Sequence, residues 1–201
     1  MSKGLKITLG VVGGILILLI GACSTFVGIY NNLVKLDEAV KSQWSQVENV
    51  YQRRADLIPN LVETVKGYAK HERETFQAVV DARSRVGSIQ AGRDVINNPE
   101  AFKKFQAAQG ELSGALSRLL AVVENYPQLK ANENFLNLQA QLEGTENRIA
   151  VERKRYNEIA MEFNAKRRSF PAVIIANMYG FKEKAYFEAE AGSEKAPKVS
   201  F

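Results

Sequence analysis

The stretch VKSQWSQVENVYQRRADLIPNLVETV, residues 40–65, decides the fold, because its large apolar side chains recur alternately every four and every three residues. Val40, Trp44, Val47 and Tyr51 begin this series, which continues to residue 65 with one charged member, Arg54. Spacings of three and four place side chains along one face of an α-helix, whereas a half-buried β-strand needs strict alternation. The stretch therefore predicts a helix with one apolar seam.

The first series continues beyond this stretch, and two further series with the same spacing lie downstream. The first contains Ile58, Leu61, Val65, Tyr68, Glu72, Thr75, Val79, Ala82 and Val86; the second contains Phe102, Phe105, Gln109, Leu112, Leu116, Leu119, Val123 and Tyr126; the third contains Phe135, Leu138, Leu142, Thr145, Ile149, Glu152, Tyr156, Ile159 and Phe163. No helix can bury its own seam, so these seams must pack against one another. We expect an all-α, coiled-coil-like fold, an antiparallel four-helix bundle with two long outer and two shorter inner helices.

Breaks in the pattern predict where the helices end. The first bundle helix is expected to continue from the N-terminal segment near Asn31, to kink at Pro59 and to turn at residues 67–71. Helices over residues 71–90, from Pro99 to about residue 126, and over residues 132–169 follow, with short connections. An alternative interpretation places the first turn at residues 55–60.

Residues 7–30 contain no charged side chain. A helix of that length reaches about 36 Å, enough to cross about 30 Å of hydrocarbon. Tyr30 followed by two asparagines is typical of a chain leaving the membrane. We therefore expect a single-pass membrane protein. Lys3 and Lys6 precede the segment and favour a cytoplasmic N-terminus.

The segment has a second interpretation, because LIGAC, residues 19–23, resembles the lipobox at which bacterial lipoproteins are cut and acylated. In that case cleavage before Cys23 would leave a lipid-modified cysteine as the anchor. The apolar character continues beyond Cys23 with Phe26, Val27 and Ile29, where a lipoprotein usually becomes polar. This continuation favours an uncut span, and both alternatives stay open at this point.

The composition excludes several classes of function. The 27 basic and 22 acidic residues are dispersed and alternate in sign, which does not favour binding of nucleic acid. One cysteine and one histidine provide no disulfide, no zinc pattern and no nucleophile–base pair, and His71 is expected at the surface. We expect no cofactor and no small-molecule substrate. An all-carboxylate metal site, formed by Glu63, Glu124, Glu143 and Glu146, is a further alternative.

Polar residues within the apolar seams mark a candidate binding region. Arg54 occupies a seam position, and a buried charge must be paired, solvated or placed along a groove. We expect it to pair with Glu143 or Glu146 across the bundle. The candidate partner groove consists of Arg53, Arg54, Asp56, Glu143 and Glu146. The alternative role for such a pair is to fix the register of the helices.

A second candidate surface lies at the base of the bundle, in KRRSFPAVIIANMYGF, residues 166–181. Basic residues beside apolar ones suit a membrane surface with anionic headgroups. The candidate contacts are Lys166, Arg167, Arg168, Phe170, Ile174 and Phe181. Alternatively, the apolar residues of this segment cap the base of the bundle. The expected organisation is a basic N-terminus (1–6), the span (7–30), the bundle (31–188) and a disordered tail (189–201).

Three long stretches resemble the bacterial LemA family. They are residues 30–83, beginning YNNLVKLDEAVKSQW and containing QRRADLIPNLV; residues 124–157, containing LEGTENRI; and residues 169–189, SFPAVIIANMYGFKEKAYFEA. The resemblance extends from about Tyr30 to Ala189. It implies a membrane-anchored antiparallel four-helix bundle with an N-terminal transmembrane helix, and it implies no molecular activity.

These features together predict a non-enzymatic, membrane-anchored scaffold that presents a helical surface to another protein of the bacterial envelope. The first alternative is a protein whose base contacts anionic lipid. The second is a carboxylate-metal enzyme. The sequence predicts neither the partner nor the oligomeric state.

Overall fold

The computed structural model describes residues 3–89 and 95–188, and this part of the chain is helical without any β-strand. Its first helix, α1 (Lys3–Lys66), runs uninterrupted for 64 residues. It contains both the uncharged N-terminal stretch and the first apolar seam. Pro59 lies inside α1 without ending it, so the chain does not turn at residues 55–60. The chain leaves the helix only at Gly67, whose N–H donates to the carbonyl of Glu63.

The remaining elements are α2 (Arg73–Ile89), the 3₁₀ helix η1 (Val95–Asn97), α3 (Pro99–Val123), α4 (Pro127–Lys130), α5 (Glu133–Arg168) and α6 (Ala172–Met178). Asparagine caps begin the two longest of them. The side-chain oxygen of Asn98 accepts from the N–H groups of Glu100 and Ala101, and that of Asn132 accepts from Phe135. Proline follows Asn98 in the first turn of α3, as the sequence predicts.

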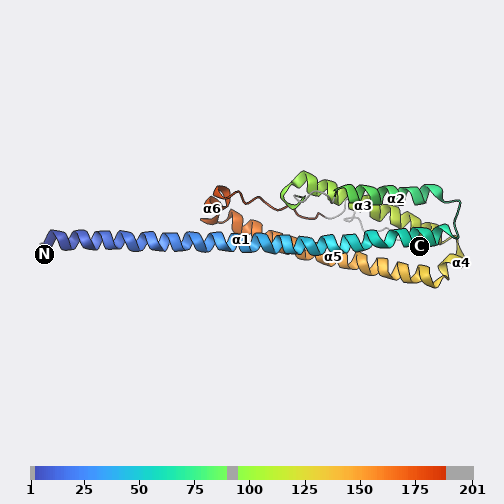
Figure 1. Cartoon of the computed structure of the whole chain (residues 1–201), viewed down its shortest axis with the longest axis horizontal. Coiled ribbons are helices and arrows are strands. Elements are labelled where there is room, and N and C mark those ends of the chain that lie inside the picture. Colours follow the sequence, from blue (N-terminus) through green and yellow to red (C-terminus); the bar gives the residue numbers. More distant parts are fainter. Residues whose placement is uncertain (1–2, 90–94, 189–201) are drawn as a thin grey trace, which may run out of the picture.

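The helices lie side by side along one end of α1 (Figure 1). α5 runs back alongside the C-terminal half of α1, and α2 packs against α3. The N-terminal part of α1 extends beyond the other helices, and its apolar side chains are exposed. By length and composition it is the one helix among the described residues that could cross a membrane.

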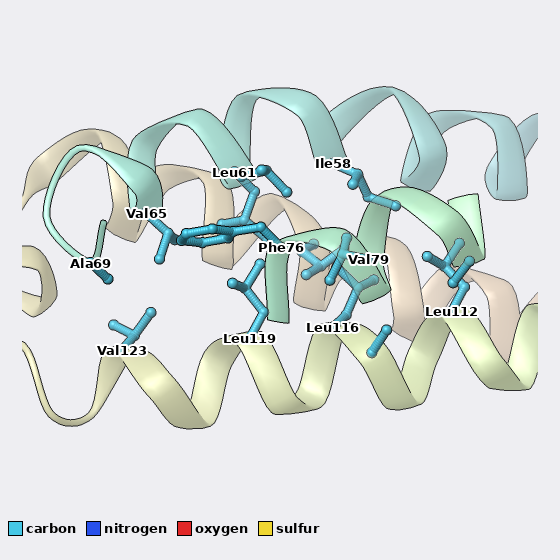
Figure 2. Packing of buried hydrophobic residues seen from close by; sticks show 14 of the residues in the cluster. Ile58, Leu61, Val65, Ala69, Phe76, Val79, Leu112, Leu116, Leu119 and Val123 are labelled. Carbon is cyan, nitrogen blue, oxygen red and sulfur yellow. The ribbon is translucent and has the colours of Figure 1, made fainter. Parts of the chain in front are cut away.

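Three groups of apolar side chains form the interior. At the end distant from the exposed part of α1, side chains from α1, α2 and α3 interdigitate, among them Val65, Phe76 and Leu119 (Figure 2). The middle of the molecule is aromatic, with Trp44 within 5.6 Å, centroid to centroid, of Phe102, Phe105 and Tyr156. A third, smaller group joins α6 to Leu33 of α1.

The predicted seams coincide with this interior except around the first turn. Tyr68 is exposed and Thr75 is half-buried, whereas Ala69 and Phe76 are buried. Residues 67–72 leave the helix, so the pattern is interrupted there. It is recovered within α2, where Val79, Ala82 and Val86 are buried as the first series predicts.

Residues 181–188, which we call the C-terminal strap, run without regular secondary structure from α6 across α5 and α3. Three amide side chains each bind both the N–H and the carbonyl of one strap residue: Asn164 binds Lys184, Asn157 binds Phe187 and Gln106 binds Glu188. Phe187 enters the aromatic group around Trp44. The strap thereby completes the interior. The predicted tail, residues 189–201, lies outside the described residues.

Candidate functional site

Arg54 is the charged residue at the centre of the candidate partner groove. Its side chain leaves α1 within the seam and is buried, with 1% of the residue exposed. Its guanidinium donates to Glu146 of α5 at 2.7 Å and to Ser113 of α3 at 2.8 Å, and it also donates to the side-chain oxygen of Gln109. The ring of Tyr51 lies 5.2 Å from the guanidinium carbon. One cation thus joins three helices.

Two donors in this cluster have no acceptor among the described residues. The Nε of Arg54 and the Nε2 of Gln109 are buried and make no hydrogen bond within this part of the chain. A buried donor without an acceptor costs roughly 1–3 kcal/mol of stability. The arrangement therefore leaves hydrogen-bonding capacity that an additional acceptor oxygen would satisfy.

The cluster opens toward the surface through two adjacent cavities. One, of about 460 Å³, is bordered by Arg54, Gln109, Ser113 and Glu146, with Lys103 at its edge. The other, of about 500 Å³, shares Ser113 and Glu146 and continues toward Glu143 and Leu120. The two cavities form a groove between α3 and α5, which we call the α3–α5 groove.

The other residues predicted for the candidate partner groove lie in different environments. Glu146 is the partner of Arg54, whereas Glu143 is exposed and accepts from Gln139 on its own helix. Arg53 and Asp56 are exposed on α1, and neither borders the two cavities. The groove also contains residues that the sequence analysis did not select, Gln109 and Ser113. Gln109 was visible in the second seam as a polar member.

The residues considered for a metal site or for nucleophilic chemistry do not lie together among the described residues. No group of three or more His, Cys, Asp or Glu side chains lies close enough there to hold a metal ion. Glu63 pairs with Lys66, and Glu146 pairs with Arg54. His71 is exposed in the turn before α2, and Cys23 is exposed on the apolar part of α1.

The residues predicted to contact a membrane surface have two different environments. Phe170 and Ile174 are exposed, together with Met178, which was not among the candidates. Phe181 is partly buried, and its carbonyl accepts from Arg167 at 2.7 Å. Lys166 is half-buried and Arg168 is exposed. The contact between Arg167 and Phe181 thus holds the strap on α5. Ile174 lies in α6, and Lys166, Arg168 and Phe170 precede that helix.

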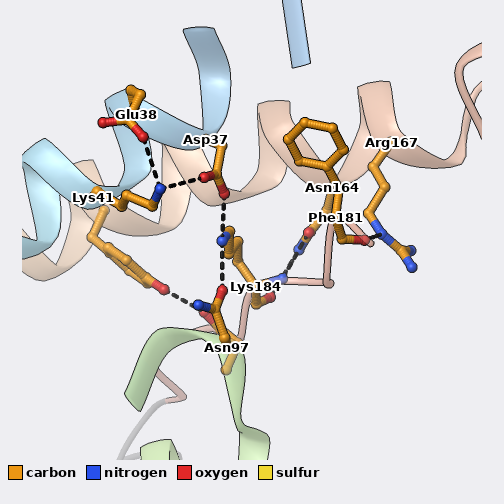
Figure 3. A network of polar contacts seen from close by, with 10 residues as sticks. Asp37, Glu38, Lys41, Asn97, Asn164, Arg167, Phe181 and Lys184 are labelled. Atoms are coloured by element: carbon orange, nitrogen blue, oxygen red, sulfur yellow. Dashed lines mark hydrogen bonds and ion pairs between the residues drawn. The ribbon is translucent and has the colours of Figure 1, made fainter. Parts of the chain in front are cut away.

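A second polar cluster, absent from the sequence analysis, fixes the strap to α1 (Figure 3). The ammonium group of Lys184 is buried and lies 2.6 Å from both Asp37 of α1 and Asn97 of η1. Asp37 also pairs with Lys41 at 2.8 Å. Lys184 comes from a segment with no seam pattern, so its burial had no signal in the spacing of apolar residues.

The surroundings of Asp37 and Tyr156 shift their pKa values. Burial raises the pKa of the Asp37 carboxyl, but the hydrogen bonds and charges of Lys184 and Lys41 outweigh this effect and hold it below its ordinary value. Burial, with a smaller contribution from Tyr186, raises the pKa of Tyr156. Its hydroxyl donates to the carbonyl of Ala185 in the strap. Asp37 is therefore a charged contact at neutral pH and Tyr156 a neutral one.

Residues 43–201 match the model of the LemA family. The magnetosome protein MamQ of Magnetospirillum gryphiswaldense is 28% identical over 193 residues, which cover 87% of this chain and 70% of MamQ. Magnetosome protein MamQ 1 of Paramagnetospirillum magneticum is 27% identical over 183 residues, covering 82% and 66%. Protein LemA of Metamycoplasma hominis is 24% identical over 164 residues, covering 82% and 71%. The chain thus spans about two thirds of the length of the curated relatives it matches.

Proposed function

The chain belongs to the LemA family, and from this premise we propose that it is a non-enzymatic scaffold, held at the bacterial cell membrane by α1, that binds another envelope protein. In this proposal α1, α2, α3 and α5 form an antiparallel four-helix bundle, and the domain is residues 31–188. The uncharged N-terminal part of α1 supports the anchor, because exposed apolar side chains over a segment of this length suit lipid and not water.

The observation that carries the proposal is the unsatisfied pair of donors beside the α3–α5 groove. A partner segment with a backbone carbonyl or a carboxylate would supply the acceptors that Arg54 and Gln109 lack. Lys103 at the edge of the same cavity adds positive charge. We therefore propose that the groove binds an extended segment of a partner protein through its acceptor oxygens. Glu143 and Glu146 border the continuation of the groove, whereas Arg53 and Asp56 are exposed on α1 and border neither cavity.

A photo-crosslinking residue at position 103 tests this proposal in native membranes. Position 104 is the matched control, because Lys103 and Lys104 are both exposed but only Lys103 borders the cavity. We expect position 103 to give a discrete adduct with one envelope protein. The double substitution Arg54→Met/Gln109→Leu, which removes the unsatisfied donors, should reduce that adduct at least about fivefold, an effect of roughly 1 kcal/mol.

Two results would contradict the proposal. The first is the same set of adducts from positions 103 and 104, with no effect of the double substitution. The second is a hydrolytic or transfer activity of the purified chain that the double substitution abolishes, because a scaffold has no turnover.

A further inference from the structure

α6 lies against the last turns of the uncharged part of α1. Ala172, Ile175 and Ala176 of α6 are buried against Leu33, and residues 26, 29 and 30 of α1 pack around them. The ring centroid of Tyr179 lies 4.6 Å from that of Tyr30, the last residue of the predicted span. The level at which α6 sits is therefore fixed by α1 (Figure 1). If α1 crosses a membrane, α6 lies where α1 leaves it.

The face of α6 directed away from α1 is apolar and exposed. Phe170 is 82% exposed, Ile174 53% and Met178 64%. Ile174 and Met178 are four residues apart and therefore lie on one side of α6, and Phe170 lies in the turn directly before it. Large apolar side chains left in water are unfavourable in proportion to their apolar surface. Three of them on one short helix and its preceding turn indicate an apolar partner.

Positive charge borders this apolar face. Arg168 at the end of α5 and Lys182 after α6 are exposed, and Lys166 is half-buried. Arg167 is engaged with the carbonyl of Phe181 and lies 4.0 Å from Glu183. Glu162 and Glu183 are the exposed acidic residues on the neighbouring turns, so cations outnumber anions around α6. Apolar side chains bordered by cations match the acyl chains and anionic headgroups of a lipid surface.

The chain turns away from this face immediately after α6. Gly180 has φ of +72°, a conformation that side chains other than that of glycine rarely adopt. The strap then runs back along the bundle. The exposed face of α6 is thus limited to one short segment at the base of the molecule.

We propose that α6 is an interfacial helix that inserts Phe170, Ile174 and Met178 into the membrane surface, with Lys166 and Arg168 placed at lipid phosphates. This inference rests on the membrane anchoring proposed above. It adds a second membrane contact, which holds the bundle at one height and in one rotation about α1. The anchor alone would leave that rotation free.

Variants of the full chain that each contain one added tryptophan test the inference. They are reconstituted in vesicles of phosphatidylcholine and phosphatidylglycerol with brominated acyl chains. Ile174→Trp reports on α6, Leu18→Trp on α1, and Leu136→Trp is the control, since Leu136 is an exposed apolar residue near the opposite end of α5. The native Trp44 lies about 21 Å along α1 beyond Tyr30 and gives a constant background. We expect bromination to reduce the fluorescence added at positions 174 and 18 at least about twofold and to leave position 136 unchanged. Met178→Trp replaces Ile174→Trp if thermal unfolding shows that the latter is misfolded.

The outcomes separate the two proposals. If Leu18→Trp is quenched and neither α6 variant is quenched more than Leu136→Trp, α1 is in the membrane but the exposed face of α6 is covered by protein or water, and the inference is overturned alone. If Leu18→Trp is not quenched, both the anchor and the inference are overturned. Quenching at positions 18 and 174, without quenching at position 136, supports both.

Discussion

At the scale of single residues, two cations are buried among the residues that the structure describes, and they have different partners. Arg54 joins α1 to α3 and α5, and Lys184 joins the strap to α1 and η1. A buried charge is stable only when its partners remain, because an unpaired charge in the interior is costly. Lys184 is nearly fully paired, whereas the cluster of Arg54 retains two unsatisfied donors. This difference makes the Arg54 cluster the better candidate for binding.

Arg54→Met should destabilise the protein by roughly 1–3 kcal/mol, because it leaves the buried side-chain oxygen of Gln109 without its donor. Adding Gln109→Leu should recover most of this loss, since the whole polar contact is then replaced by apolar groups. Urea unfolding of the full chain in detergent, followed by circular dichroism, measures both effects. Arg53→Met at the exposed neighbouring position is the control. A double variant that loses the sum of the two single losses would contradict this account.

Asp37 should make the stability depend on pH. Its pKa is lower in the folded chain than in the unfolded chain, so its contribution is complete above the ordinary aspartate pKa of about 3.9 and is lost as the pH falls through the folded-state value. The unfolding free energy of the wild type should therefore fall more steeply between about pH 5 and pH 3 than that of Asp37→Asn. Asp56→Asn, at an exposed carboxylate, should keep the slope of the wild type. Equal slopes for Asp37→Asn and the wild type would exclude this role.

At the scale of elements, the strap is the least ordinary feature. Three of its residues pair their backbone groups with side-chain amides in place of a neighbouring strand, with Asn157, Asn164 and Gln106 each forming a paired contact. Buried backbone groups require partners, so these three amides allow an extended segment to lie on helices. Phe187 and Lys184 then contribute apolar and charged contacts to the interior.

Asn157→Ala should loosen the strap without unfolding the helices. It removes two hydrogen bonds to Phe187, each worth roughly 1 kcal/mol, so amide exchange in residues 181–188 should become about ten- to hundredfold faster. Hydrogen exchange with mass spectrometry measures this, and α2 should keep its protection. Asn147→Ala, at an exposed position of α5, is the control. Unchanged exchange in the strap would show that the contact with Asn157 does not contribute to holding it.

The long elements could be predicted from the sequence and the short ones could not. The seams gave the extents of α3 and α5 within a few residues, because apolar spacing over several turns determines which side of a helix is buried. α4 and α6 are shorter than two seven-residue repeats, so they contain no repeat to recognise. Arg54 was found as a charge that interrupts a seam. Lys184 and the amides of the strap were not found, because their roles depend on contacts between segments distant in sequence.

At the scale of the whole molecule, one helix connects the candidate membrane segment to the bundle. α1 continues past Cys23 to Lys66, and Phe26, Ile29 and Tyr30, which follow Cys23, pack against the α6 group. This continuity supports an uncut span, because the residues after Cys23 belong to a packed helix and do not form a polar tether.

The chain purified from native membranes should therefore retain residues 1–22 and carry an unmodified Cys23. Intact-mass spectrometry and labelling with a radioactive fatty acid check this. Cys23→Ser should leave the mass unchanged except for the substitution itself. A product that lacks residues 1–22 and carries a lipid adduct would establish the lipoprotein alternative.

Because α1 is one uninterrupted helix from its proposed membrane segment to Lys66, a change in the angle of that segment would move the helices packed against the other half of α1. About 54 Å of helix lies beyond Tyr30, so a tilt of about 10° would move the far tip sideways by about 9 Å. Thinner and thicker bilayers impose different tilts on a helix of fixed apolar length. A change in the local thickness of the membrane would thus appear as a larger sideways displacement at the far end of the helices.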